Sequence, residues 1–97
     1  MNSDVSISAP TAYKVSQNYP NPFNPVTDIS YNLPIDSKVS INVYDIKGSL
    51  IATLADGVMT AGYHTVTFDA SNLPSGTYFY RIIAGELTET KKMLLVK

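Results

Sequence analysis

From residue 27 to the end of the chain, apolar side chains recur at about every second position. A period of two is typical of β-strands that bury one face and expose the other. In the segment TDISYNL, for example, the apolar positions are Ile29, Tyr31 and Leu33. With a short first strand added, the predicted strands fall within residues 13–17, 27–33, 38–46, 49–55, 63–69, 77–84 and 86–97.

Turn-forming residues separate these strands. Pro34 cannot donate to a β-ladder and biases its predecessor away from helix. The tetrapeptide DIKG predicts a tight turn in which Asp45 bonds backbone amides and Gly48 adopts a positive φ. The dipeptide Asp56-Gly57 is a second turn signal, and it predicts the end of the strand before it.

No stretch of the chain shows helical periodicity. The pattern predicts an all-β fold, an immunoglobulin-like antiparallel β-sandwich of about seven strands. Residues 77–84 are apolar on both faces except at Arg81, as expected of a central strand in a sandwich. We assign residues 13–97 to this one domain and residues 1–12 to a polar linker.

The composition is that of a small folded domain. Of the 97 residues, 44% are hydrophobic and 15% are charged, and the formal charge is −1. The basic residues cluster only at the C-terminus, which argues against binding to DNA or RNA. The chain has no cysteine, so packing must stabilise it. A domain of this size has little area for a deep active site, and we expect a monomer.

No apolar run reaches the roughly 18 to 20 residues that a membrane helix needs. The opening segment MNSDVSISAP also lacks the charged and apolar regions of a signal peptide. The sequence therefore predicts neither a membrane span nor an export leader. We interpret Met1 as the initiator of a segment taken from a longer protein.

Residues with catalytic or metal-binding chemistry are few. His64 is the only histidine, and it lies in register with Val66 and Phe68 on the predicted inward face. We interpret it as a packed residue at the edge of the core, with a satisfied ring. The run DASN at 69–72 offers oxygen ligands for calcium, but it lacks the acidic pattern of a calcium loop. We expect no metal site and no cofactor.

No candidate nucleophile stands beside a base in the sequence, so we expect no catalytic residues. The seven tyrosines invite an alternative function, an accessory module that binds carbohydrate or protein. However, Tyr31, Tyr78 and Tyr80 lie in alternating apolar runs, which indicates that they belong to the core.

The stretch SQNYPNPFNP at residues 16–25 combines three prolines and three asparagines with two aromatic residues. Proline fixes φ and pushes the preceding residue toward extended geometry. We predict a stiff corner between the first two strands, in which Tyr19 and Phe23 cap one end of the core. The amides of Asn21 and Asn24 should satisfy backbone groups of this corner.

Four segments occur in a characteristic order: NYPNPFNP, VYDIKGSLIATL, AGYHTVTFDASNLPSGTYFYRI and TKKMLLVK. Together they resemble the type A C-terminal sorting domain of the type IX (Por) secretion system of Bacteroidetes, over residues 17–97. Each segment is weak evidence alone, whereas the ordered set is specific. The structural motif of the family corresponds to Tyr19, Pro20, Asn21, Pro22, Phe23, Asn24, Pro25, Asp45, Gly48, Gly62, Gly76 and Tyr78.

The resemblance implies a non-catalytic export signal that follows a cargo domain. In this family the cargo folds in the periplasm and an outer-membrane translocon moves it to the cell surface or the exterior. A sortase-like surface enzyme commonly removes the signal. The partners implied are therefore the translocon, the sortase-like component and the upstream cargo. The residues implied in recognition are Lys91, Lys92, Met93, Leu94, Leu95, Val96 and Lys97.

The immunoglobulin-like domain of the flagellar hook-capping protein is similar, because it shares the YPNPF and VYD..G patterns. That family usually carries a Trp-Asp-Gly element and a longer loop where this chain has FDASNLPSG. The shorter loop and the lysine-flanked end favour a sorting domain.

The terminal run KKMLLVK admits two interpretations. Its main chain could pair with a receptor along a sheet edge, or MLLV could be the last strand, buried in the sandwich. Because neighbours on a strand point to opposite faces, four consecutive apolar residues cannot all be buried on one side. We expect both interpretations to hold in part.

Overall fold

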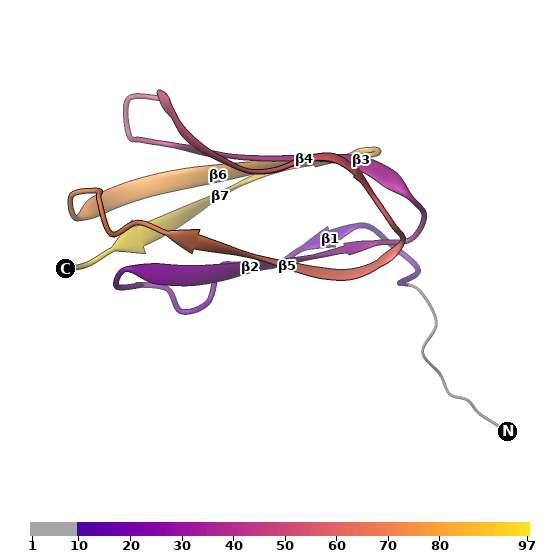
Figure 1. The fold of residues 1–97 in the computed structure, drawn as a ribbon, viewed down its shortest axis with the longest axis horizontal. Helices are drawn as coiled ribbons and strands as arrows, with labels where there is room; N and C mark the ends of the chain where they lie inside the picture. The colour runs from indigo at the N-terminus through magenta and orange to yellow at the C-terminus, as the bar shows by residue number, and fades with distance from the viewer. Residues whose placement is uncertain (1–9) are drawn as a thin grey trace, which may run out of the picture.

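The structure, a computed structural model, describes residues 10–97, which form two antiparallel sheets packed face to face (Figure 1). One sheet has the order β1-β2-β5 and the other the order β4-β3-β6-β7. The strands are β1 (Lys14–Val15), β2 (Val26–Leu33), β3 (Ser37–Tyr44), β4 (Leu50–Met59), β5 (Gly62–Asp69), β6 (Gly76–Ala84) and β7 (Leu87–Leu95). The predicted all-β sandwich is confirmed. Met1 and most of the predicted linker 1–12 lie outside the described residues.

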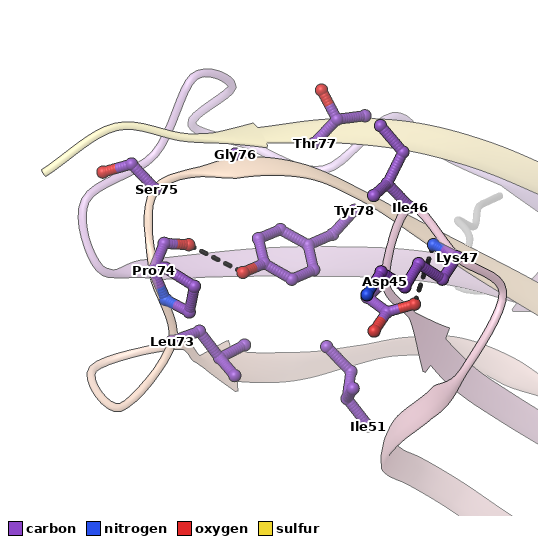
Figure 2. A pocket seen from close by; sticks show the side chains of 10 residues that line it. All are labelled: Asp45, Ile46, Lys47, Ile51, Leu73, Pro74, Ser75, Gly76, Thr77 and Tyr78. Carbon is purple, nitrogen blue, oxygen red and sulfur yellow. Dashed lines mark hydrogen bonds between the residues drawn. The ribbon is translucent and has the colours of Figure 1, made fainter.

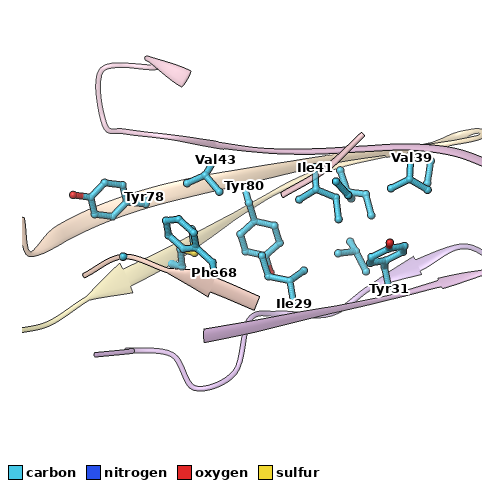
Figure 3. Close-up of a cluster of buried hydrophobic side chains, with 14 of the residues drawn as sticks. Ile29, Tyr31, Val39, Ile41, Val43, Phe68, Tyr78 and Tyr80 are labelled. Carbon is cyan, nitrogen blue, oxygen red and sulfur yellow. The ribbon is translucent and has the colours of Figure 1, made fainter. Parts of the chain in front are cut away.

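The core lies between the two sheets, because β2, β3 and β6 each bury every second side chain. Figure 3 shows these side chains meeting from both layers. Tyr80 is fully buried, and its hydroxyl donates to the carbonyl of Ser16 at 2.7 Å. Burial raises the pKa of this phenol to about 12. Tyr31 and Tyr78 are also buried, so the prediction that all three tyrosines belong to the core is confirmed.

The apolar run 77–84 forms β6, which lies between β3 and β7 as a central strand should. Only one of its faces is covered. Tyr78, Tyr80 and Ile82 are buried against the other sheet, whereas Ile83 on the outer face is 44% exposed. A run that is apolar on both faces therefore contributes one face to the core and one to the surface.

The turn predicted at Asp56-Gly57 does not form, and β4 continues to Met59. The reason is the length of its partner, since β3 still offers Val39 opposite Gly57 and Ser37 opposite Met59. Two register shifts in the β3–β4 pairing let β4 stay in the ladder.

The first strand is shorter than the predicted 13–17 and comprises Lys14–Val15 only. After Val15 the chain still bonds β2 through Ser16, whose N–H donates to the carbonyl of Ser30 at 2.8 Å. It then enters the corner, residues 16–25, and pairs again with β2 as an isolated bridge at Tyr19 and Asp28.

Candidate recognition site at the terminal strand

The terminal signal predicted from the sequence lies mostly on β7, an edge strand of the four-stranded sheet. Met93 and Leu95 are buried in the sandwich, whereas Leu94 is 41% exposed and Val96 is 48% exposed. The expected division of MLLV between the core and the surface is confirmed. Lys91 is half-buried, and Lys92 and Lys97 are exposed.

The corner lies directly against the end of β7, although the two segments are far apart in the sequence. Phe23 forms a parallel bridge with Leu95. Its N–H donates to the carbonyl of Leu94 and its carbonyl accepts from the N–H of Val96, both at 2.9 Å. The N–H of Leu94 donates to Oδ1 of Asn21 at 3.0 Å. The main chain of the last strand is therefore held by the corner.

The Phe23 side chain is 2% exposed and packs against Phe68, with a ring-centroid distance of 6.1 Å. The prediction that Phe23 caps the core is confirmed. The same prediction for Tyr19 is wrong, because its side chain is 80% exposed. Tyr19 exchanges two backbone hydrogen bonds of 2.9 Å with Asp28, and this pairing directs its side chain to the solvent.

A polar residue that the sequence did not single out lies next to Tyr19 in the interior. Asn18 is 2% exposed, and its Nδ2 donates to Oγ1 of Thr27 at 3.0 Å and to the carbonyl of Pro20 at 3.1 Å. Gln17 reaches β7 instead, where its Nε2 donates to the carbonyl of Lys92 at 2.8 Å. No local pattern in the sequence indicates the bond from Gln17, because Lys92 lies 75 positions away.

The remaining corner residues shape the crossing between β1 and β2. The peptide bonds before Pro20, Pro22 and Pro25 are cis. Pro20, Pro22 and Asn24 are exposed, and the carbonyl of Pro25 accepts from the N–H of Ala70 at 2.9 Å. The corner is thus bonded to the β5–β6 loop as well as to β7.

Three motif residues, Asp45, Gly76 and Tyr78, come together around a pocket of about 380 Å³ at one end of the sandwich. Figure 2 shows Tyr78 beside the β3–β4 turn, with its hydroxyl directed to the carbonyl of Pro74, a hydrogen bond of 2.6 Å. Apolar side chains line much of its wall, among them Ile51 at the start of β4 and Leu73 in the β5–β6 loop.

The motif residues around this pocket act as structural supports. Oδ1 of Asp45 accepts from the N–H groups of Lys47 and Ser49 at 2.9 Å each, and Gly48 has a φ of 86°, so the predicted turn is confirmed. Gly62 lies elsewhere, opposite Leu33 at the start of β5.

His64 is a packed residue, as predicted. Its ring stacks on Tyr31 at a centroid distance of 5.1 Å. Its Nε2 lies 2.7 Å from the carbonyl oxygen of Thr60, and because a carbonyl can only accept, Nε2 carries the proton. Within residues 10–97, no group of three or more His, Cys, Asp or Glu side chains is placed to hold a metal ion.

The β5–β6 loop, which contains the DASN run, binds the end of the chain. The Asp69 carboxylate accepts hydrogen bonds from the hydroxyl and the N–H of Ser71, and these bonds lower the pKa of Asp69. Lys97 bonds the same loop, since its Nζ donates to the carbonyl of Ser71 at 2.7 Å and its N–H to Oγ of Ser75 at 3.0 Å. The corner, this loop and residues 92–97 form one cluster.

A family model described as "Secretion system C-terminal sorting domain" matches residues 17–97, from the corner to the end of β7 and beyond. The chain belongs to this family. The match confirms the resemblance to type IX sorting domains, a family of non-catalytic domains that act as sorting signals for secretion. No curated protein matches the chain. Among the described residues, no helix could cross a membrane.

In this sorting domain, the first and last segments of the family motif are in direct contact. Gln17 bonds β7 at Lys92, and Phe23 bonds it at Leu94 and Val96. The ordered segments that carried the resemblance thus describe one structural unit. A candidate recognition site follows: the exposed side chains of β7 and of the residues after it, held in place by the corner.

Proposed function

We propose that this domain is recognised by the type IX outer-membrane translocon after its cargo enzyme has folded in the periplasm. The cargo then reaches the cell surface or the exterior, where a sortase-like enzyme removes the domain. The segment that the translocon contacts is Lys91–Lys97.

One observation carries this proposal. The corner fixes the main chain at Leu94 and Val96 by hydrogen bonds, while both side chains stay exposed. Apolar side chains on an ordered backbone lose little conformational freedom when a partner covers them. Lys92 and Lys97 surround them with positive charge, which adds a second, electrostatic feature for a receptor.

Main-chain pairing with a receptor would be restricted to the first half of β7. The corner already bonds Leu94 and Val96, and Gln17 takes the carbonyl of Lys92. Because backbone groups alternate in direction along a strand, Thr88 and Thr90 point their N–H and C=O groups out of the sheet. Because Glu89 and Lys91 place inward charges on that half, which oppose strand addition, the translocon reads Lys91–Lys97 through its side chains.

The test is export of a reporter fused ahead of residues 13–97 in a bacterium with the type IX system. We expect the unchanged fusion in the medium or on the cell surface. The double variant Leu94→Ser, Val96→Ser should leave the reporter in the periplasm. Both residues are exposed, so the variant avoids the core damage that deletion of Lys91–Lys97 would cause at Met93 and Leu95.

Val58→Ser is the matched control, because Val58 is an exposed apolar residue on β4, away from the terminal cluster. This variant should be exported normally. Circular dichroism of the isolated domains must show that all variants are folded. Export of the double variant at the level of the control would refute the assignment of the terminal side chains.

A further inference from the structure

The outer face of the four-stranded sheet is aromatic and basic over β3, β6 and β7. The outward positions of these strands follow from the alternation with their buried residues. They include three cations, Lys38, Arg81 and Lys92, and no Asp or Glu, whereas the edge strand β4 adds Asp56 opposite Ser40. These cations are far apart in the sequence, so the chain shows no basic cluster there until it folds.

Arg81 is held at the centre of this face by two contacts. Its Nε donates to Oγ1 of Thr90 at 3.2 Å, and its guanidinium lies 6.0 Å from the ring centre of Tyr44. The hydrogen bond engages Nε alone, and within the described part of the chain none engages the two Nη groups. An arginine restrained in this way is prepared to bind a carboxylate with two parallel hydrogen bonds.

Two hollows lie along this face. One, of about 310 Å³, is lined by Tyr44, Gly48, Phe79, Arg81 and Thr90. The other, of about 380 Å³, is lined by Lys38, Ser40, Ile83 and Gly85. Phe79 and Ile83 are four positions apart on β6, so about 13 Å of strand connects the two hollows. This layout suits an extended ligand rather than a small, round one.

The backbone argues against an extended peptide on this face. β3 and β6 are inner strands, each hydrogen-bonded to a neighbour on both sides. A peptide that crosses them finds no free main-chain groups, and it would have to bind through side chains alone. Aromatic rings, hydroxyl groups and cations together are the groups that suit sugar rings and their acidic substituents.

We propose that this face binds an acidic polysaccharide, with a uronate carboxylate on Arg81 and sugar rings against Tyr44 and Phe79. Lys38 and Lys92 lie to either side, where they would attract further carboxylates along the polymer. This binding differs from the proposed translocation signal, which uses the exposed residues at the end of β7, although Lys92 contributes to both.

The experiment is titration of the whole chain with polygalacturonate, with neutral dextran and with polyglutamate, each at low and at moderate salt. We expect polygalacturonate to bind at least about ten times more tightly than either of the others, because only it offers both ring faces and carboxylates. Arg81→Gln and Tyr44→Ala should each weaken this binding by about tenfold, while Tyr44→Phe keeps most of it.

Lys14→Gln is the charge-matched control, since Lys14 is exposed on β1 in the other sheet. It should change the affinity by less than about twofold. Melting curves must show that all four variants fold. Equal binding of dextran, or no binding of polygalacturonate, would overturn the proposal. The proposal would also be overturned if polyglutamate bound as tightly as polygalacturonate and if Tyr44→Ala did not weaken its binding. That result would show a surface that attracts any acidic chain.

Discussion

The two halves of β7 protect the same sheet edge in different ways. In the first half, the outward main-chain groups at Thr88 and Thr90 face solvent, while Glu89 and Lys91 place charges on the side that faces the other sheet. Inward charges on an edge strand oppose pairing with other chains. In the second half, the corner itself covers the edge through Phe23.

This difference follows from the length of β1. A first strand of only two residues cannot cover the whole of β7 from the opposite sheet. The corner continues where β1 stops, and Gln17 and Phe23 bond the edge at Lys92, Leu94 and Val96. Both halves of β7 thus pair with β6, and the second half is stabilised in addition by long-range contacts with the corner.

The largest effect should come from the side chain that anchors the corner. Phe23→Ala removes a ring that is 2% exposed and packed on Phe68, so we expect a loss of about 3 to 5 kcal/mol in the free energy of unfolding. Chemical denaturation of the isolated domain measures it. A loss below about 0.5 kcal/mol, typical of a surface site, would mean that the corner does not anchor the second half of β7.

A pair of proline substitutions compares the two halves directly. Leu94→Pro removes the N–H that donates to Asn21, and should cost about 2 kcal/mol. Thr88→Pro removes an N–H that faces solvent, and should cost less than about 1 kcal/mol. Thermal unfolding of both variants measures these two losses of stability. Equal losses would show that the corner adds nothing to the edge.

The smallest effect concerns the loop that binds Lys97. Hydrogen bonds from Ser71 lower the pKa of Asp69 below its ordinary value of 3.8. The stabilisation from this carboxylate is complete above pH 3.8 and is lost as the pH falls through the lowered folded value. The melting temperature should therefore fall on acidification, and Asp69→Asn should reduce that fall slightly. If the melting temperature of Asp69→Asn fell on acidification as much as that of the unchanged domain, Asp69 would not contribute to the acid sensitivity of the fold.

Alternating apolar positions predict most of the strands, because each strand buries one face and the period is visible locally. They fail at Asp56-Gly57, where pairing with Val39 outweighs a local turn preference. They also fail at Tyr19, since its direction depends on a backbone pair with Asp28 that no local pattern reveals.

The sequence predicts which segment forms the candidate site, but not the contacts that hold this segment in place. The sequence indicates that MLLV divides between core and surface, and Met93 and Leu94 do so. Its support by the corner depends on contacts such as that between Asn21 and Leu94, 73 positions apart. The restrained Arg81 likewise requires Tyr44 and Thr90 from neighbouring strands.

The contact between Phe23 and the end of β7 also sets the order in which the domain can be completed. The corner is synthesised before its main-chain partners at Leu94 and Val96. Closure therefore waits until residue 96 has been synthesised, and contacts of such long range form slowly. A finished corner thus reports that translation has passed residue 96, which makes the folded domain a check on the integrity of the polypeptide that carries it.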